Sequence, residues 1–144
     1  MFCFIMSIFI IPDDILRQQQ MSGAGLRIKV KKAGDNIRQL ILRGVVDGHT
    51  AKTLEKAIID VIESNICKII LDFMRVSYLG SAGIGVIIAC KGKLTDRFPN
   101  QASDIVIVNP IDSVRDVFNL LEISNSISIV STEEEAAAQL NSLE

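Results

Sequence analysis

The run ICKIILDF, residues 66–73, constrains the fold more than any other stretch of the chain. It is almost continuously apolar, and its length suits a strand. A strand that is apolar on both sides has to be covered on both faces, which is typical of the middle of a parallel sheet with helices packed on it. The run DIVIV, residues 104–108, predicts another buried strand, whereas MRVSYLG, residues 74–80, is expected to form a loop.

The segments around these runs predict further strands and helices. Residues 26–32 alternate apolar and polar side chains, and a short turn joins them to a strand at 37–44, which predicts an antiparallel hairpin. The segment that Ser81 opens exceeds strand length and predicts a helix. Helical spacing of apolar side chains predicts an earlier helix that contains Ala51, Leu54, Ala57, Ile58, Val61 and Ile62.

Two more helices and a last strand complete the pattern. In NPIDSVRDVFNLL, Asn109 is expected to cap a helix and Pro110 to occupy its first position. Residues 126–130 predict the last strand, and Thr132 with Glu135 has the spacing of a capping box. The order ββαβαβαβα predicts an α/β domain with a mainly parallel central sheet, an antiparallel edge strand and about four packed helices.

The chain length of 144 residues corresponds to one domain. The sequence places this domain at residues 26–144 and leaves residues 1–25 as an apolar N-terminal extension. The extension opens with eleven nearly continuous apolar residues, a run too short for a membrane span and without the features of a signal peptide. Two interpretations stay open: Met21 is the natural start, or the extension docks on the domain or forms a homodimer with a second copy.

Charge and composition exclude several classes of function. The net charge is −2, with one Tyr, no Trp and no long basic run, which argues against direct nucleic-acid binding. The lysines between 29 and 32 are expected on a solvated edge strand. His49 has no Cys or His at ligand spacing, so no metal site is expected. Scattered cysteines indicate reduced cytosolic thiols in the core, namely Cys3, Cys67 and Cys90.

The stretch GSAGIG, residues 80–85, raises the question of a nucleotide site. It lacks the Gly-Lys-Ser/Thr end of a P-loop, and its spacing differs from G-x-G-x-x-G. The simpler interpretation is that Gly80 allows a tight turn, while Gly83 and Gly85 let the first helical turn lie close to another backbone. That backbone would belong to a neighbouring strand or to a partner protein.

Ser81 has three candidate roles at the start of its helix. The first role is that of a simple helix N-cap. A nucleophile would need a base, and a catalytic triad would rest entirely on His49, without the G-x-S-x-G elbow. The third role fits better, because a phosphate on Ser81 would meet unpaired backbone N–H groups and the positive end of the helix dipole.

Two carboxylates are expected near Ser81. Asp47 and Asp72 are predicted at the ends of strands or in the loops that follow, at the edge of the sheet where Ser81 lies. Without a lysine or a metal beside them, turn or cap roles are favoured over catalysis. The sequence therefore predicts no catalytic residue and no cofactor.

Residues 70–94, ILDFMRVSYLGSAGIGVIIACKGKL, resemble the signature of the STAS domain, the module shared by sulfate transporters and anti-sigma factor antagonists. LRGVVDGHTAKTLEKAI, residues 42–58, is similar to the upstream Gly-Glu-Leu-Asp block of that family and its helix. NPIDSVRDVFNLLEI, residues 109–123, is similar to the later Pro-x-Val helix. The resemblance runs from about Leu26 to the C-terminus.

The resemblance implies roles for individual residues. Ser81 aligns with the serine that anti-sigma kinases phosphorylate, Asp47 and Gly83 align with motif residues, and Asp72 aligns with the strand-end Asp or Asn. The implied partner-binding patch consists of Asp47, Gly48, Ser81, Ala82 and Gly83.

Two positions depart from the family pattern. Gly80 stands in place of the aspartate before the serine, and Val45 in place of the glutamate of the upstream block. Both departures remove negative charge beside Ser81. They would either weaken recognition by a kinase or ease the addition of a phosphate.

The resemblance implies an anti-sigma factor antagonist in a bacterial cytoplasm. The unphosphorylated protein would bind an anti-sigma factor serine kinase, which would then release the regulator it held. The kinase would phosphorylate Ser81 and a PP2C-type phosphatase would reverse this, so the protein would be a switch and not an enzyme. The alternatives are a constitutive STAS assembly subunit of a transporter or signalling complex, which Gly80 favours, and a small nucleotide-binding or hydrolytic enzyme.

Overall fold

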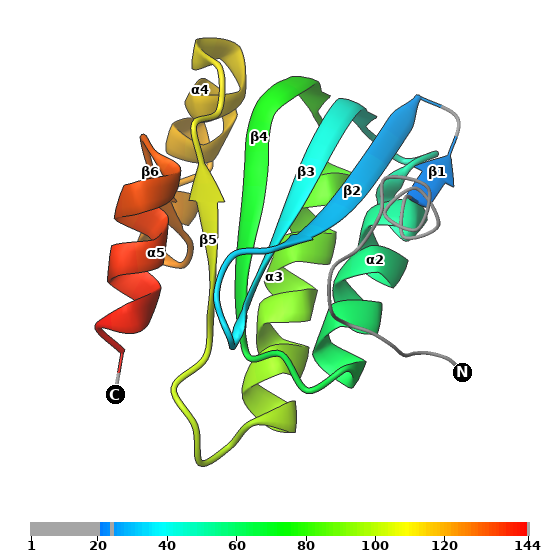
Figure 1. Ribbon diagram of the computed structural model, residues 1–144. Coiled ribbons are helices and arrows are strands. Elements are labelled where there is room, and N and C mark those ends of the chain that lie inside the picture. Colours follow the sequence, from blue (N-terminus) through cyan, green and yellow to red (C-terminus); the bar gives the residue numbers. More distant parts are fainter. Residues whose placement is uncertain (1–20, 24, 144) are drawn as a thin grey trace.

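The computed structural model of the chain describes residues 21–23 and 25–143. Its centre is a six-stranded sheet with the strand order β1-β2-β3-β4-β5-β6, and helices pack on both faces (Figure 1). The α/β fold class predicted from the sequence is confirmed. In chain order the elements are β1 (Met21–Gly23), β2 (Leu26–Lys32), β3 (Ile37–Val46), α2 (Ala51–Glu63), β4 (Lys68–Leu79), α3 (Ser81–Arg97), β5 (Asp104–Val108), α4 (Asp112–Leu120), the 3-10 turn η1 (Ile123–Asn125), β6 (Ser128–Val130) and α5 (Glu133–Asn141).

The sheet is antiparallel at one side and parallel at the other. β1, β2 and β3 pair antiparallel, whereas β3, β4, β5 and β6 pair parallel. β1 is a strand that the sequence did not predict, because three residues are too few to show a period. It covers the first part of β2, with Ser22 opposite Arg27. Residues 1–20, and with them the expected homodimer and Cys3, lie outside the described residues.

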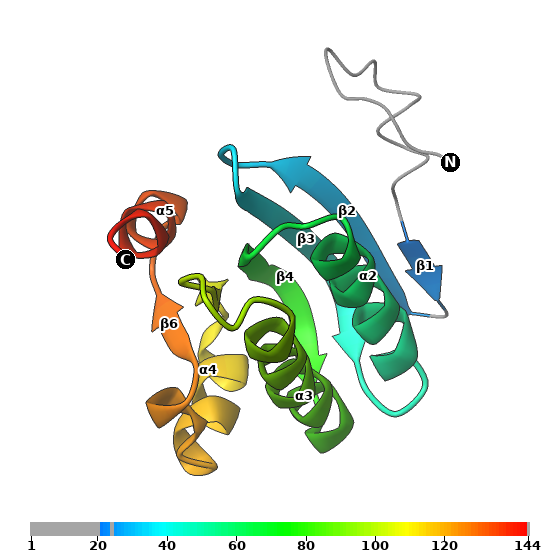
Figure 2. The ribbon, with the colours of Figure 1, turned by 90° about the horizontal axis from the view of Figure 1, so that it is seen from below.

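The helices form two unequal layers. α2 and α3 lie side by side on one face of the sheet, and α5 covers part of the other face (Figure 2). The larger core lies under α2, α3 and α4, where the rings of Phe73 and Phe118 pack 6.1 Å apart. The smaller core lies between α5 and the strands β3, β4 and β5. No helix among the described residues is both long and apolar enough to cross a membrane.

β4 is longer than predicted. The segment 74–80 was expected to be a loop, but the strand continues to Leu79. Two register shifts against β3 allow this, and they change which side chains face the core: Val76 and Leu79 are buried, while Tyr78 is exposed. At one shift Gly44 has a φ of +124°, and a Cβ there would lie 2.0 Å from a backbone oxygen. The alternation of β4 is broken at these bulges, and this explains why its second half resembled a loop.

The predicted start of α4 is wrong, and that of α5 is confirmed. Asn109 has a φ of +54° and its N–H donates to the Val130 carbonyl, so it extends the pairing of β5 with β6 instead of capping a helix. The helix begins at Asp112, with Ile111 as the N-cap. At α5 the Thr132 hydroxyl accepts the Glu135 N–H (3.1 Å), as the capping box predicts.

Candidate functional site

Ser81 is the first residue of α3, where the helix leaves the carboxyl end of β4. Its side chain is exposed. The N-cap is Gly80, with an extended backbone, and no side chain caps the helix. The interpretation of Ser81 as a helix cap is therefore wrong: the helical hydrogen bonds begin at the Gly80 carbonyl, which accepts the Ile84 N–H. The Ser81 hydroxyl is left without a capping role.

Backbone hydrogen bonds attach this helix start to the neighbouring strand. The Gly80 N–H donates to the Val46 carbonyl at the end of β3 (2.8 Å). Among the described residues, the N–H groups of Ser81 and Ala82 have no acceptor, and the first turn of α3 holds no acidic residue. We call residues 80–83 together with Val46 the α3 junction. It presents free N–H groups and the positive end of a helix dipole at an exposed hydroxyl.

Gly83 and Gly85, the two glycines in the first turns of α3, have different structural roles. A Cβ on Gly83 would lie 2.4 Å from Val46 Cγ1 and 2.8 Å from Leu79 Cδ1, so this glycine lets the helix pack directly on β3 and β4. Gly83 is buried, and its close neighbours are side chains. From the sequence, a neighbouring backbone was expected at this position. Gly85 faces open space, with nothing within 4 Å of a Cβ. The packing of the domain therefore requires Gly83 but not Gly85.

Asp47 lies in the loop between β3 and α2, one residue after Val46. Its Oδ1 accepts the backbone N–H groups of His49 (2.9 Å) and Thr50 (3.1 Å). Backbone hydrogen bonds, above all that of His49, hold the pKa of the Asp47 carboxyl below its ordinary value. Gly48 is exposed at the tip of the loop, and nothing would lie within 4 Å of a Cβ there. Asp47 therefore acts first as a turn residue, as the sequence suggested, at the sheet edge where Ser81 lies.

Thr50 organises this loop and was not recognised in the sequence. Its side chain is fully buried. The hydroxyl donates to the Val45 carbonyl (2.9 Å) and accepts the Asp47 N–H (2.9 Å). The Asp-x-x-Thr spacing was the available signal, since side chains of both types bond to nearby backbone groups in turns.

Asp72 does not belong to the site. It lies inside β4, opposite Ile41, where a position at the strand end was predicted. Its carboxylate accepts the Gln39 side-chain amide (3.2 Å) and the Met74 N–H (3.0 Å). The prediction failed because β4 continues to Leu79 and carries the sheet edge away from Asp72.

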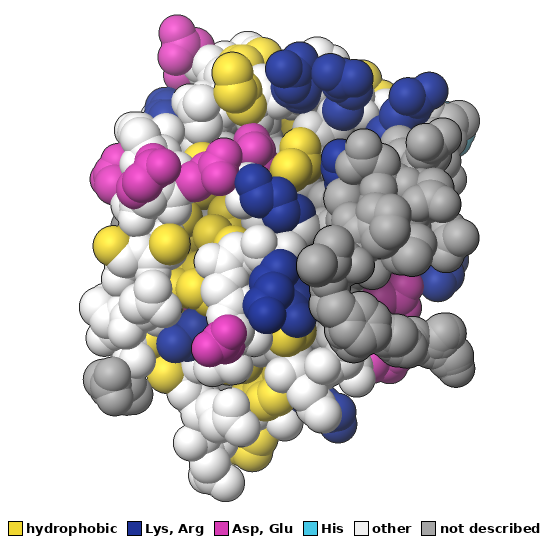
Figure 3. Space-filling view, in the orientation of Figure 1, with side chains coloured by type: hydrophobic (Ala, Val, Ile, Leu, Met, Phe, Trp, Pro, Cys, Tyr) yellow, Lys and Arg dark blue, Asp and Glu magenta, His cyan; other side chains and the backbone are white. Residues whose placement is uncertain are grey.

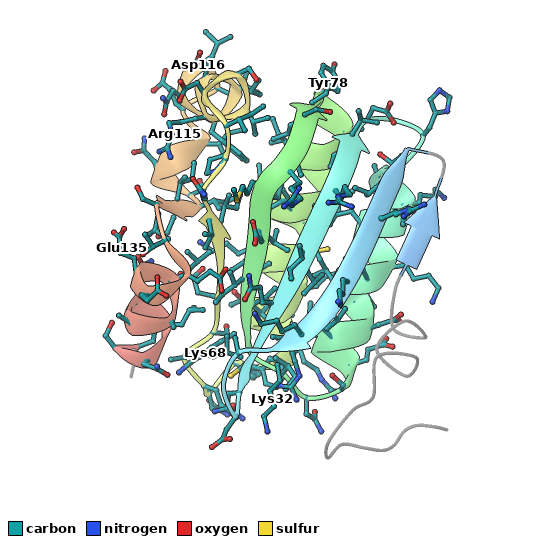
Figure 4. The ribbon with its side chains drawn as sticks, turned by 45° about the horizontal axis from the view of Figure 1, so that its top comes forward. Lys32, Lys68, Tyr78, Arg115, Asp116 and Glu135 are labelled. Atoms are coloured by element: carbon teal, nitrogen blue, oxygen red, sulfur yellow. The ribbon has the colours of Figure 1, made fainter. Side chains whose placement is uncertain are left out.

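Small side chains surround Ser81 on the exposed side of α3. Ala82, Gly85 and Ala89 are exposed there, and Ile88 is 46% exposed. Tyr78 flanks the junction and is 55% exposed. Figure 4 shows Tyr78 at the same end of the molecule as Arg115 and Asp116 of α4. The exposed surface near Ser81 therefore combines small side chains with Ile88 and Tyr78, and charged side chains of α4 lie at the same end of the molecule.

The chemistry within reach of Ser81 is limited. In the described part of the chain, His49 makes its hydrogen bond through the backbone N–H, to Asp47. No group of three or more His, Cys, Asp or Glu side chains there is placed to hold a metal ion. Cys67 and Cys90 are buried free thiols, as predicted, and burial raises the pKa of Cys90 to about 11.

Comparison with known proteins agrees with the fold. Residues 28–136 match the family model described as the STAS domain. The crystal structure of an anti-sigma factor antagonist from Mycobacterium paratuberculosis superposes with a TM-score of 0.71 and 22% identity, over 81% of this chain and 94% of that one. The structure of the anti-sigma factor antagonist SpoIIAA in its unphosphorylated form superposes with a TM-score of 0.66 and 23% identity, over 79% of this chain and 96% of that one. The structure of the phosphorylated form of SpoIIAA, a Bacillus cell fate determinant, superposes with a TM-score of 0.59 and 22% identity, over 78% of this chain and 98% of that one.

Proposed function

The chain belongs to the STAS domain family, and we propose that it is an anti-sigma factor antagonist, a partner switch controlled by phosphorylation of Ser81. In this proposal the unphosphorylated protein binds an anti-sigma factor serine kinase in the bacterial cytoplasm. The protein is the substrate of the kinase and not itself an enzyme. Solved relatives of the same fold include one protein in both its unphosphorylated and its phosphorylated form.

One observation carries the proposal: the exposed hydroxyl of Ser81 stands at an uncapped helix N-terminus. Among the described residues, the N–H groups of Ser81 and Ala82 have no acceptor. Because Gly80 is the N-cap and the first turn of α3 holds no acidic residue, no carboxylate of this turn competes for these groups. Phosphate groups are stabilised by free N–H groups and by the helix dipole in such positions. The departure from the family pattern at Gly80 removes one negative charge that would repel a phosphate at this site.

The switch works through charge. The kinase transfers the γ-phosphoryl group of ATP to Ser81 Oγ, so that the bond to ADP breaks, a P–O bond to serine forms, and the hydroxyl proton leaves. The phosphate adds about −1.5 to −2 charges at neutral pH. The proposed docking patch contains Ser81, Ala82, Asp47 and Gly48, whose small side chains allow a partner to approach closely. Gly83, also expected in the patch, is buried against Val46 and Leu79 and is not available to a partner. A phosphate in the docking patch would have to be desolvated and would weaken docking. A PP2C-type phosphatase restores the hydroxyl with water.

Incubation of the full chain with the kinase and ATP tests the proposal. We expect one added phosphate in the intact mass, mapped to Ser81 by peptide fragmentation. Ser77 provides the matched control, since it is an exposed serine close by in sequence whose hydroxyl donates to the Gly44 carbonyl. Ser81→Ala should abolish the added mass, and Ser77→Ala should leave it unchanged. Phosphate on Ser77 or Ser113 instead of Ser81 would contradict the site assignment.

A constitutive STAS assembly subunit is the second candidate, which the absence of the usual aspartate at position 80 favours. In that case Ser81 only contributes a small exposed side chain to a permanent interface. The protein would then take up no phosphate, and Ser81→Asp would bind the assembly partner as well as Ser81→Ala does.

A further inference from the structure

Three arginines form a line across the sheet on the face opposite α2 and α3. The strand register sets Arg27 of β2 opposite Arg43 of β3, and Arg43 opposite Arg75 of β4. Adjacent strands lie about 4.8 Å apart, so the three side chains leave the sheet as close neighbours. We call these residues the arginine row.

The arginine row lacks counter-charges in the described part of the protein. The ion pairs found there are formed by lysines outside the row, namely Lys32, Lys56, Lys91 and Lys93. The closest carboxylate in the register, that of Asp72, is already occupied by Gln39 and the Met74 N–H. Like charges directly opposite one another on a sheet are destabilising. Within the described residues, folding alone therefore gives no reason for the row.

The row borders an open hollow. Arg27, Lys29, Arg43 and Arg75 line this depression of about 390 Å³, with Ile41 as its apolar floor. All four basic side chains are exposed. α5 packs on this face against parts of β3, β4 and β5 that do not include the arginine row, and Figure 3 shows the Lys and Arg side chains gathered over β2, β3 and β4. Exposed cations over a shallow sheet face suit an extended anionic surface better than an enclosed small ligand.

A lipid surface fits this face better than a nucleic acid does. Stacking of bases needs exposed aromatic rings. Phe73, Phe98 and Phe118 are buried, and the exposed Tyr78 does not line the hollow. The sequence adds an independent signal, because residues 1–11 are almost continuously apolar. Residues 12–20 join that run to β1 and span up to about 30 Å when extended. β1 borders the row, since its Ser22 lies opposite Arg27.

We propose that the outer sheet face lies against an anionic lipid bilayer, with the arginine row and Lys29 at the headgroup phosphates and the apolar sequence of residues 1–11 as a second signal for a membrane. Stable attachment to a membrane needs two signals, such as an apolar insertion and a basic patch. Each basic side chain near an anionic surface adds to the attachment. The α3 junction packs on β3 and β4 from the opposite side of the sheet, so Ser81 stays accessible to a partner. This inference goes beyond the proposed switch and does not rest on it.

Vesicle flotation with the full chain tests the inference. We expect binding to phosphatidylcholine vesicles that contain phosphatidylglycerol, weaker binding at high salt, and little binding to phosphatidylcholine alone. The variant Arg27→Gln/Arg43→Gln/Arg75→Gln should reduce partitioning by about 10- to 100-fold. The control Lys52→Gln/Lys56→Gln/Lys93→Gln removes as many charges from exposed positions on α2 and α3 and should change partitioning by less than about threefold.

Three results would overturn the inference. Equal binding to neutral and anionic vesicles would show that the arginine row contributes nothing. Equal losses in the two triple variants would show that only net charge matters. Retention of duplex DNA or polyglutamate without any binding of vesicles would assign the row to a different occupant. Because the replaced arginines are exposed, a thermal unfolding curve of each variant confirms that it is folded before flotation.

Discussion

The α3 junction and the arginine row involve the same two central strands, and they are built in opposite ways. At the junction the buried groups have a structural reason: Gly83 fits against Val46, and Thr50 forms the hydrogen bonds that hold the loop beside it. Among the described residues, the Ser81 hydroxyl and the N–H groups of Ser81 and Ala82 have no such role. At the row the strand register brings like charges together, against stability. A feature that stabilises the fold says little about function, whereas one that opposes stability points to something outside the chain.

The largest expected effect separates structural from exposed glycines within α3. Gly83→Ala should lower the free energy of unfolding by about 1–3 kcal/mol, because a Cβ would lie 2.4 Å from the β-branched Val46. Gly85→Ala is the matched control in the same helix. It should raise the free energy of unfolding by about 0.5–1 kcal/mol, since its Cβ meets open space and alanine favours helix. Urea unfolding measures both. Equal effects of the two substitutions would contradict the packing assigned to the junction.

The second effect concerns the Ser81 hydroxyl at the α3 junction. Ser81→Asp should weaken binding to the kinase by about tenfold, because it adds a charge that docking must desolvate. Ser81→Ala should bind like the original chain. Isothermal titration with the cognate kinase measures both, and equal affinities of the two variants would eliminate the switch. Ser81→Ala should not move the unfolding midpoint much, since Ser81 has no capping role.

The third effect concerns the uncapped N-terminus. Gly80→Asp should stabilise α3 by about 0.5–1 kcal/mol, because aspartate is a good N-cap and complements the helix dipole. The same carboxylate should slow phosphorylation of Ser81, since it occupies the free N–H groups and repels the phosphate. Urea unfolding and the initial rate of phosphate uptake measure the two parts. Faster uptake would instead show that the kinase recognises the aspartate found in the family pattern.

The sequence predicted most of the fold because the buried runs and helical spacings carry strong periodic signals. It failed where the period is interrupted. The bulges opposite Gly44 hid the second half of β4, and this error also put Asp72 at the wrong place. Asn109 looked like a cap, but a left-handed φ and a bond to Val130 show that its role depends on the pairing of β5 with β6.

The candidate site was only partly visible in the sequence for a similar reason. The motif located Ser81 and Asp47 near one sheet edge, since both follow parallel strands. The identity of the N-cap at Gly80 and the buried role of Thr50 depend on backbone geometry that a pattern of residue types does not contain. The arginine row was not visible at all, because its members are far apart in sequence and only the register aligns them.

The smallest expected effect tests whether the arginine row does oppose the fold. Arg43→Gln removes the central charge, which faces Arg27 on one side and Arg75 on the other. The free energy of unfolding should rise by about 0.2–0.5 kcal/mol at low salt, and the gain should shrink at high salt as the repulsion is screened. Lys52→Gln on α2 serves as the control for the loss of one exposed charge. A loss of stability on Arg43→Gln, absent from the control, would mean that Arg43 makes a favourable contact within the chain. The row would then have a structural explanation, and the contrast with the α3 junction would disappear.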